Sequence, residues 1–248
     1  MATYALTDAD IFVDGLDYGP YGRKASITVD VAERDITTFA SAGWTEIRGV
    51  LKSSAVELEG FQDYSATAAD GTLAGPDPTL LLAAGSTYTL TAVPMGATVG
   101  AVSYFTQGML RQLTPLEGDV NEVGMAKYAF TGRTPVVRGQ VERTAPITAT
   151  GSSAGVNFTT LPAGQRMWAA AHVLSASGTT PSLTLKVQSG NDAGFSSPID
   201  RVTFTAMTAR GGQFGSYVGP STHPYWRFSW TVTGTSPSFV VVLSFGIQ

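Results

Sequence analysis

The residues best suited to catalysis lie at 151–155, where GSSAG matches the pattern G-x-S-x-G. In α/β-hydrolases this pattern holds a nucleophilic serine on a tight turn between a strand and a helix, and an acid and a histidine follow along the chain. Here Ser153 is followed by Asp192 or Asp200 and then by His223. The residues that come next, VNFTTL, are typical of a strand, so the required helix is missing. We therefore predict that the chain is not an enzyme and keep a serine hydrolase as the weakest of three hypotheses.

Metal-binding residues are sparse, because the chain contains two histidines and no cysteine. His172 shares strand parity with Trp168 and Leu174, which predicts a core or half-buried histidine. His223 lies in the turn sequence GPSTHPYW and is predicted to be a surface residue. Two acidic segments, DADIFVDGLD and EGDVNE, lack the register of an EF-hand, and solvated turns explain them. We predict no transition-metal site and no cofactor, and calcium between subunits stays an open alternative.

Aromatic side chains offer a second chemistry, because aromatic faces stack on sugar rings. The candidates in the C-terminal half are Trp168, Tyr217, Tyr225 and Trp226. In a β-sandwich such residues more often belong to the core, since each buries a large area. A carbohydrate- or surface-binding decoration or baseplate module is therefore the second functional hypothesis.

The composition favours a weakly charged protein with a substantial core. Of 248 residues, 43% are hydrophobic and 14% are charged, against about 25% charged in an average soluble domain. Such a surface suits a subunit of a stable assembly, although an ordinary Thr/Ser-rich β-sandwich explains it equally well. No apolar run approaches the roughly 18 residues of a membrane helix, and the N-terminal residues lack signal-peptide features. We expect a soluble product without membrane contact.

The charges divide unevenly along the chain. Residues 1–146 contain 17 acidic and 10 basic side chains, a balance of −7. Residues 147–248 contain 2 acidic and 5 basic side chains, a balance of +3, so the two together give the net charge of −4. This asymmetry predicts two domains, 1–146 and 147–248, with different surroundings. An acidic N-terminal domain is unsuited to binding DNA by neutralising phosphates.

Strand-like alternation organises the N-terminal domain around residues 24–64, which predict two long strands with apolar and polar residues alternating. Residues 1–23 are predicted to be irregular, and 65–78 to form a long loop. Asp77-Pro78 then predicts a short helix that ends at Gly85. Further strands are predicted at 86–93, 99–113, 124–132 and 135–142.

The C-terminal domain is predicted to be a β-sandwich, Ig-like or jelly-roll-like, with short strands separated by Gly, Pro, Ser and Asn turns. A linker or loose edge strand over residues 144–155 precedes it. The predicted strands are 156–161, 166–174, 182–188, 201–208, 213–218, 225–232 and 238–247. The fold class predicted for the whole chain is thus all-β with one short helix.

Four segments of the N-terminal domain, taken in order, resemble the tail-tube (major tail) proteins of long-tailed bacteriophages. They are ITVDVAERDITTF, AGWTEIRGVLKSSAVELEGFQD, GMLRQLTPLEGDV and TGRTPVVRGQV, within residues 24–142. The second is similar to the family's second tube strand, with a Gly-Leu-Lys-like step at residues 49–52 and a terminal Gly-Phe-x-Asp at 60–63. Val50 departs from the pattern by separating the glycine from the leucine.

The resemblance implies a tail-tube-type β-barrel or sandwich with a flanking helix, assembled into hexameric rings. In that family, strands of neighbouring subunits line a channel and extended loops contact the adjacent ring. Stacked rings surround a tape-measure protein and later conduct DNA. The implied partners are other copies of the chain, the tape-measure protein, and tail terminator and distal tail proteins, with DNA passing through without specific binding. The implied location is the virion tail, after synthesis in the host cytoplasm.

The C-terminal domain resembles the outward-facing decoration domain of some tail proteins. A contractile sheath would need that outer surface free, so we expect a non-contractile tail. In the N-terminal domain the balance of −7 predicts an acidic channel wall that repels phosphate. In a tube subunit, where the polar face would be channel wall or ring contact, Phe61 is predicted to be buried at the end of its strand. The predicted inter-subunit or channel-facing residues are Asp30, Glu57, Glu59, Phe61, Asp63, Asp70 and Asp77.

Overall fold

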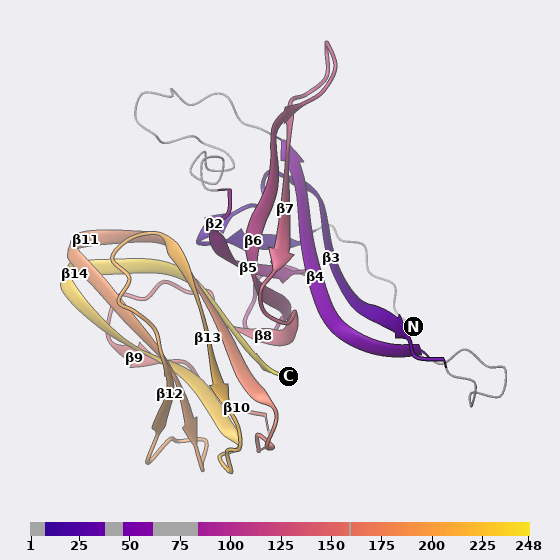
Figure 1. Ribbon diagram of the computed structural model, residues 1–248. Coiled ribbons are helices and arrows are strands. Elements are labelled where there is room, and N and C mark those ends of the chain that lie inside the picture. Colours follow the sequence, from indigo (N-terminus) through magenta and orange to yellow (C-terminus); the bar gives the residue numbers. More distant parts are fainter. Residues whose placement is uncertain (1–7, 38–46, 62–83, 159) are drawn as a thin grey trace. The chain divides into compact units, whose positions relative to one another are not determined.

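The computed structural model describes residues 8–37, 47–61, 84–158 and 160–248. These residues form fourteen strands and no helix, which confirms the all-β fold class (Figure 1). The short helix predicted after Asp77 lies outside the described residues. Within the described ranges, no helix is long and apolar enough to cross a membrane.

The chain divides into two compact units, and the division differs from the boundary predicted after residue 146. The larger unit contains residues 1–21, 88–107 and 137–248, and the smaller unit contains 22–87 and 108–136. The difference arises because the chain enters and leaves the smaller unit twice. In the sequence, the smaller unit has 12 acidic and 8 basic residues, a balance of −4, and the larger has 7 of each.

The larger unit is built around two long strands, β11 (Arg166–Gly190) and β14 (Tyr225–Ile247), which pair antiparallel along most of their length. Each strand has a glycine with positive φ near its middle, Gly178 and Gly234, and the pairing register shifts close to both. The two halves of each strand contribute to two layers that share one core. Phe228 of one half packs on Phe245 of the other, with ring centroids 5.4 Å apart. Four of the predicted sandwich strands are therefore halves of these two.

Shorter strands extend both layers of the larger unit. Residues 144–155 contribute an edge strand, one of the two predicted alternatives, because β9 (Gly151–Ser152) pairs with β14. β1 (Asp10–Val13) and β2 (Leu16–Asp17) form a hairpin, so the prediction that residues 1–23 are irregular is wrong there. The others are β5 (Thr87–Val93), β8 (Val137–Arg143), β10 (Val156–Asn157), β12 (Ile199–Thr203) and β13 (Gly211–Val218).

The smaller unit is an antiparallel sheet in the order β3, β4, β7, β6. Its strands are β3 (Gly22–Asp35), β4 (Ile47–Phe61), β7 (Met125–Gly132) and the part of β6 (Val102–Glu117) from residue 108 onward. The long strand pair predicted within residues 24–64 is β3 and β4. Alternation places one set of side chains on a buried face: Val56, Leu58, Leu110, Ala126, Tyr128 and Phe130.

Candidate assembly surface

β3 is an exposed edge strand. It is 14 residues long, pairs with β4 on one side, and has no other partner among the described strands. Its apolar side chains Ile27, Val29 and Val31 are 37%, 57% and 48% exposed. A long edge strand with exposed apolar residues readily pairs with another chain, because its backbone N–H and C=O groups are unpaired on one side. This strand is therefore the candidate surface for assembly.

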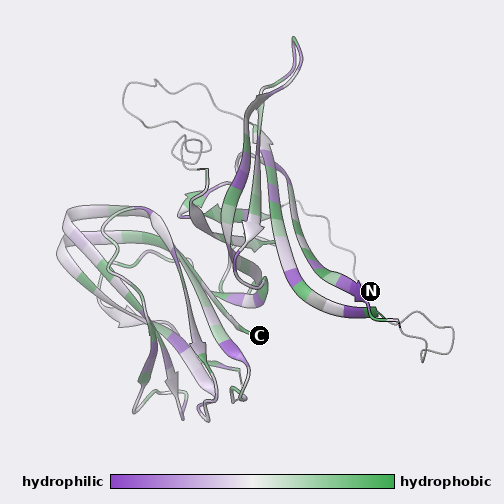
Figure 2. Ribbon diagram, viewed as in Figure 1, coloured by the Kyte–Doolittle hydropathy of each residue, from purple (hydrophilic) through white to green (hydrophobic). Residues whose placement is uncertain are grey.

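The two faces of the sheet in the smaller unit differ in chemistry. Residues directly opposite each other in an antiparallel pair lie on the same face. Ile27 is opposite the buried Val56, whereas Ser26 is opposite Glu57. Hydrophobic and hydrophilic positions alternate along β3 and β4 in Figure 2. We call the first side the apolar face and the second the charged face, which carries Lys24, Ser26, Asp30, Glu57, Glu59, Phe61, Arg111 and Lys127.

Cations and carboxylates are interleaved on the charged face. Arg111 Nη2 lies 3.3 Å from Glu57 Oε1, and Lys127 Nζ lies 2.6 Å from Glu117 Oε1. The hydrogen bond to Glu117 raises the pKa of Lys127, and Glu59 adds to this effect. A depression of about 160 Å³ lies on this face. Glu57 and Glu59 therefore each have a cation nearby, and the acidic channel wall stays a prediction.

Four of the seven predicted site residues lie together on the charged face. Asp30 comes from β3, and Glu57, Glu59 and Phe61 occupy alternate positions of β4. The Phe61 side chain is 42% exposed in the single chain, and its burial within a tube stays a prediction. The alternation that buries Leu58 directs Phe61 to the same side as the two glutamates. The remaining three lie outside the described residues: Asp63, Asp70 and Asp77.

The residues of the hydrolase pattern are not brought together. Ser153 Oγ accepts a hydrogen bond from Phe228 N at 3.0 Å, and a strand rather than a helix follows. His223 Nδ1 lies 3.0 Å from Ser189 Oγ, and Asp200 pairs with Lys186. Because His223 is buried in this network, its prediction as a surface residue is wrong.

His172 is a fully buried core histidine, as predicted. Its Nδ1 accepts a hydrogen bond from Gly15 N at 3.2 Å, and its Nε2 lies 2.8 Å from Thr91 Oγ1. Burial lowers the pKa of His172 to about 3. The ring is therefore neutral and serves to connect β11 to the turn between β1 and β2. No group of acidic or histidine side chains within the described ranges is arranged to hold a metal ion.

The aromatic residues considered for sugar stacking are engaged within the larger unit. Trp226 is fully buried. The Arg201 guanidinium lies 4.6 Å from the centroid of the Tyr217 ring and covers one face of it. Trp168 packs against Phe214, with ring centroids 5.6 Å apart. These contacts favour a structural role for three of the four candidates.

Comparisons with known proteins give distant likenesses. No protein-family model matches the chain, and no curated protein does. A chain from the virion of a native gene transfer agent (GTA) particle is 16% identical, with a TM-score of 0.39, over 54% of this chain and 97% of that chain. A chain from the tail of an empty GTA particle is 14% identical, with a TM-score of 0.35, over 47% and 80%.

A third similar structure is the Dit protein of phage SPP1, described as a paradigm of the hub adsorption apparatus in phages that infect Gram-positive bacteria. It is 14% identical, covers 97% of this chain and 99% of its own, and has a TM-score of 0.34. Because all three TM-scores are below 0.5, we base the proposed function on the residues of this chain.

Proposed function

We propose that the chain is a structural subunit of a phage tail, which self-assembles into stacked rings that form the tail tube. One observation carries this proposal, namely the exposed edge strand β3 with its three exposed apolar residues, Ile27, Val29 and Val31. A strand from a second copy would pair the free backbone groups of β3 and cover these side chains. In a free monomer, the backbone groups on this side of β3 would have no partner among the described strands and the three apolar side chains would stay exposed to water.

The finer features of this function come from the resemblance in sequence. We assign six subunits to each ring, a tape-measure protein inside the channel, and DNA passage through it. The C-terminal part of the chain serves as an outward decoration on a non-contractile tail. The charged face supports a channel or ring-contact role, because interleaved ion pairs leave no continuous cationic surface to hold phosphate. The protein has no enzymatic role in this scheme.

Electron microscopy of the purified protein tests the proposal. We expect rings and tubes for the natural sequence, and discrete monomers for Val29→Glu, because the charge would be buried against the added strand. Thr28→Glu is the matched control, since it places the same charge on the next residue of β3 but on the charged face. We expect it to assemble. Monomers of the natural protein at high concentration would refute the proposal, and so would assembly of Val29→Glu at an unchanged concentration.

The serine-hydrolase hypothesis has its own test in Ser153→Ala. Ser153 Oγ bonds to the backbone of Phe228, so we expect a loss of about 1 kcal/mol in the free energy of unfolding. We expect assembly to be unchanged. An esterase assay on the natural protein checks the chemistry, and an activity that disappears in Ser153→Ala would contradict a purely structural role.

A further inference from the structure

The β3–β4 pair projects beyond the rest of its sheet. β4 pairs with β7 only from Ala55 to Phe61, so residues 47–54 pair with β3 alone. Eight residues of strand span about 25 Å at roughly 3.3 Å per residue. We call this projecting part, residues 29–37 with 47–54, the arm.

The end of the arm holds two exposed arginines. Arg34 lies directly opposite Arg48 in the register, and like charges in that position destabilise a strand pair. Neither forms an ion pair within the part of the chain that the structure describes. Ile36 and Leu51 beside them are 46% and 73% exposed. These four residues, Arg34, Ile36, Arg48 and Leu51, are the arm tip.

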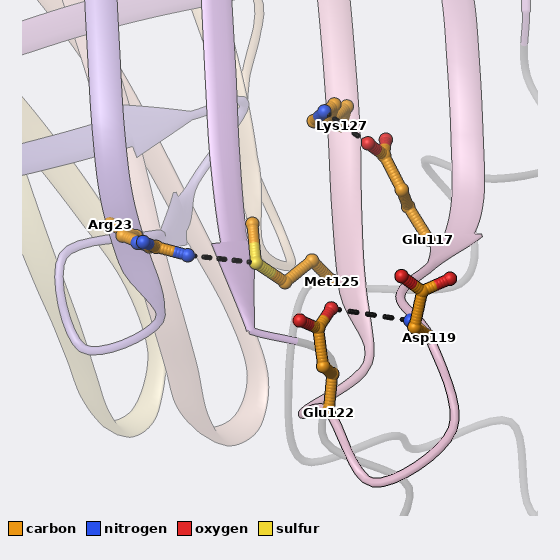
Figure 3. A network of polar contacts seen from close by, with 6 residues as sticks. All are labelled: Arg23, Glu117, Asp119, Glu122, Met125 and Lys127. Carbon is orange, nitrogen blue, oxygen red and sulfur yellow. Dashed lines mark hydrogen bonds and ion pairs between the residues drawn. The ribbon is translucent and has the colours of Figure 1, made fainter.

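The hairpin between β6 and β7 has the complementary chemistry. Asp119 and Glu122 are its two carboxylates, and the Asp119 backbone N–H donates to Glu122 Oε2 at 3.2 Å (Figure 3). Val120 and Val123 are 92% and 63% exposed. We call these four residues the hairpin tip.

The cations near the hairpin tip contact residues other than its two carboxylates. Figure 3 shows Lys127 bonded to Glu117, and Arg23 directed at Met125 Sδ, 3.2 Å away. Among the described residues, Asp119 and Glu122 therefore have no ion-pair partner. The hairpin tip thus combines two available carboxylates with two exposed valines.

The two tips lie at opposite ends of one sheet. The hairpin tip follows the end where Phe61 pairs with Met125, and the arm tip lies at the end where Asp35 pairs with Ile47 (Figure 1). The 15 residues of β4 separate these ends, which is about 50 Å of strand. One chain is therefore unable to bring its own tips together, whereas two copies stacked end to end are able to do so.

We propose that the arm tip of one copy docks on the hairpin tip of the next copy, with the arginine pair facing the carboxylate pair and the apolar residues packing together. Such a head-to-tail contact repeats along an axis when the rotation between successive copies does not close a ring. This inference rests on the proposed function, because it assigns the contact between successive rings of the tube.

Charge reversal tests the contact. Arg34→Glu with Arg48→Glu reverses the arm tip, and Asp119→Lys with Glu122→Lys reverses the hairpin tip. We expect each double variant to need at least a tenfold higher protein concentration to form tubes, while single rings persist. An equimolar mixture of the two double variants should form tubes again, because each reversed tip then meets a complementary tip on the other protein.

Lys52→Glu is the matched control for Arg48→Glu. It makes the same charge change four residues along β4, but its register partner is Val31, on the other face of the arm. We expect its tube-forming concentration to be unchanged in light scattering and electron microscopy. Tubes from both reversed variants at the natural concentration would overturn this contact and leave the proposed function intact. A natural protein that forms no rings would instead overturn the proposed function.

Discussion

Gly15→Ala is expected to destabilise the larger unit by about 4 kcal/mol, the sum of backbone strain and a steric clash. Gly15 has a φ of +85°, where a side chain costs free energy. An added Cβ would lie 2.3 Å from Val173 O and 2.7 Å from Gly211 N. Both contacts are to backbone atoms, so no side-chain rotation relieves them. The hydrogen bond from Gly15 N to His172 would also be distorted.

Gly164→Ala separates strain from clash. Gly164 has nearly the same φ, +86°, but a Cβ there would meet nothing within 4 Å. We expect a loss of about 1 kcal/mol at this position, from strain alone. Urea unfolding followed by tryptophan fluorescence measures both values in the Val29→Glu background, because assembly would otherwise add to the apparent stability. Equal losses at the two glycines would show that the packing around Gly15 is looser than these distances indicate.

The turn at Gly15 also shows what the sequence could have revealed. Asp14 and Gly15 both have positive φ and connect two strands, the arrangement favoured in a two-residue hairpin. Asp-Gly between the apolar run IFV and the next short strand is a strong hairpin signal. The Asp-Gly dipeptide therefore predicts a hairpin within residues 1–23, which the absence of longer alternation there does not.

The strand continuity of β11 and β14 was harder to predict. Their midpoints read GTTPS and GTSPS, and Gly and Pro so close together normally indicate a reversal of the chain. In the structure the two midpoints face each other, with Thr179 opposite Thr235, so each strand bends while the pair stays together. A bend shared by two paired strands depends on their contact with each other, which a single-sequence pattern does not contain.

The candidate surface was predicted in part. Alternation placed Asp30, Glu57 and Glu59 on one face, and the structure confirms that arrangement. The same alternation gave Ile27, Val29 and Val31 to the opposite face, where they are exposed rather than buried. Periodicity shows which residues share a face, whereas burial depends on what covers that face. The apolar face of β3, the most informative part of the surface, therefore required the structure.

The unfolding free energy is expected to change little between pH 4.5 and 6.5 from two buried groups whose effects oppose each other. Burial raises the pKa of Glu142 from 4.5 to about 7 and lowers that of His172 from 6.5 to about 3. In this interval the folded protein holds a proton on Glu142 and none on His172. The unfolded chain does the reverse, so no net proton is exchanged by this pair on unfolding.

Two single variants isolate the contribution of each group to the pH dependence of the unfolding free energy. In Glu142→Gln only His172 remains, and stability should fall by about 2 kcal/mol as the pH drops from 6.5 to 4.5, because the unfolded state gains the proton. In His172→Gln only Glu142 remains, and stability should fall by about the same amount as the pH rises over that range, because the unfolded state releases the proton that the folded state keeps.

Urea titrations at three pH values, each compared with the unsubstituted protein in the Val29→Glu background, measure these slopes and cancel the contribution of all other carboxylates. Gln140 Nε2 donates to Glu142 Oε1 at 2.7 Å, and the amide oxygen of the glutamine variant is able to accept the same bond. Slopes of the same sign in the two variants would contradict the assignment. Opposite slopes would show that the folded protein holds Glu142 as a neutral acid and His172 as a neutral base, so this pair leaves the unfolding free energy nearly unchanged as the pH falls to 4.5.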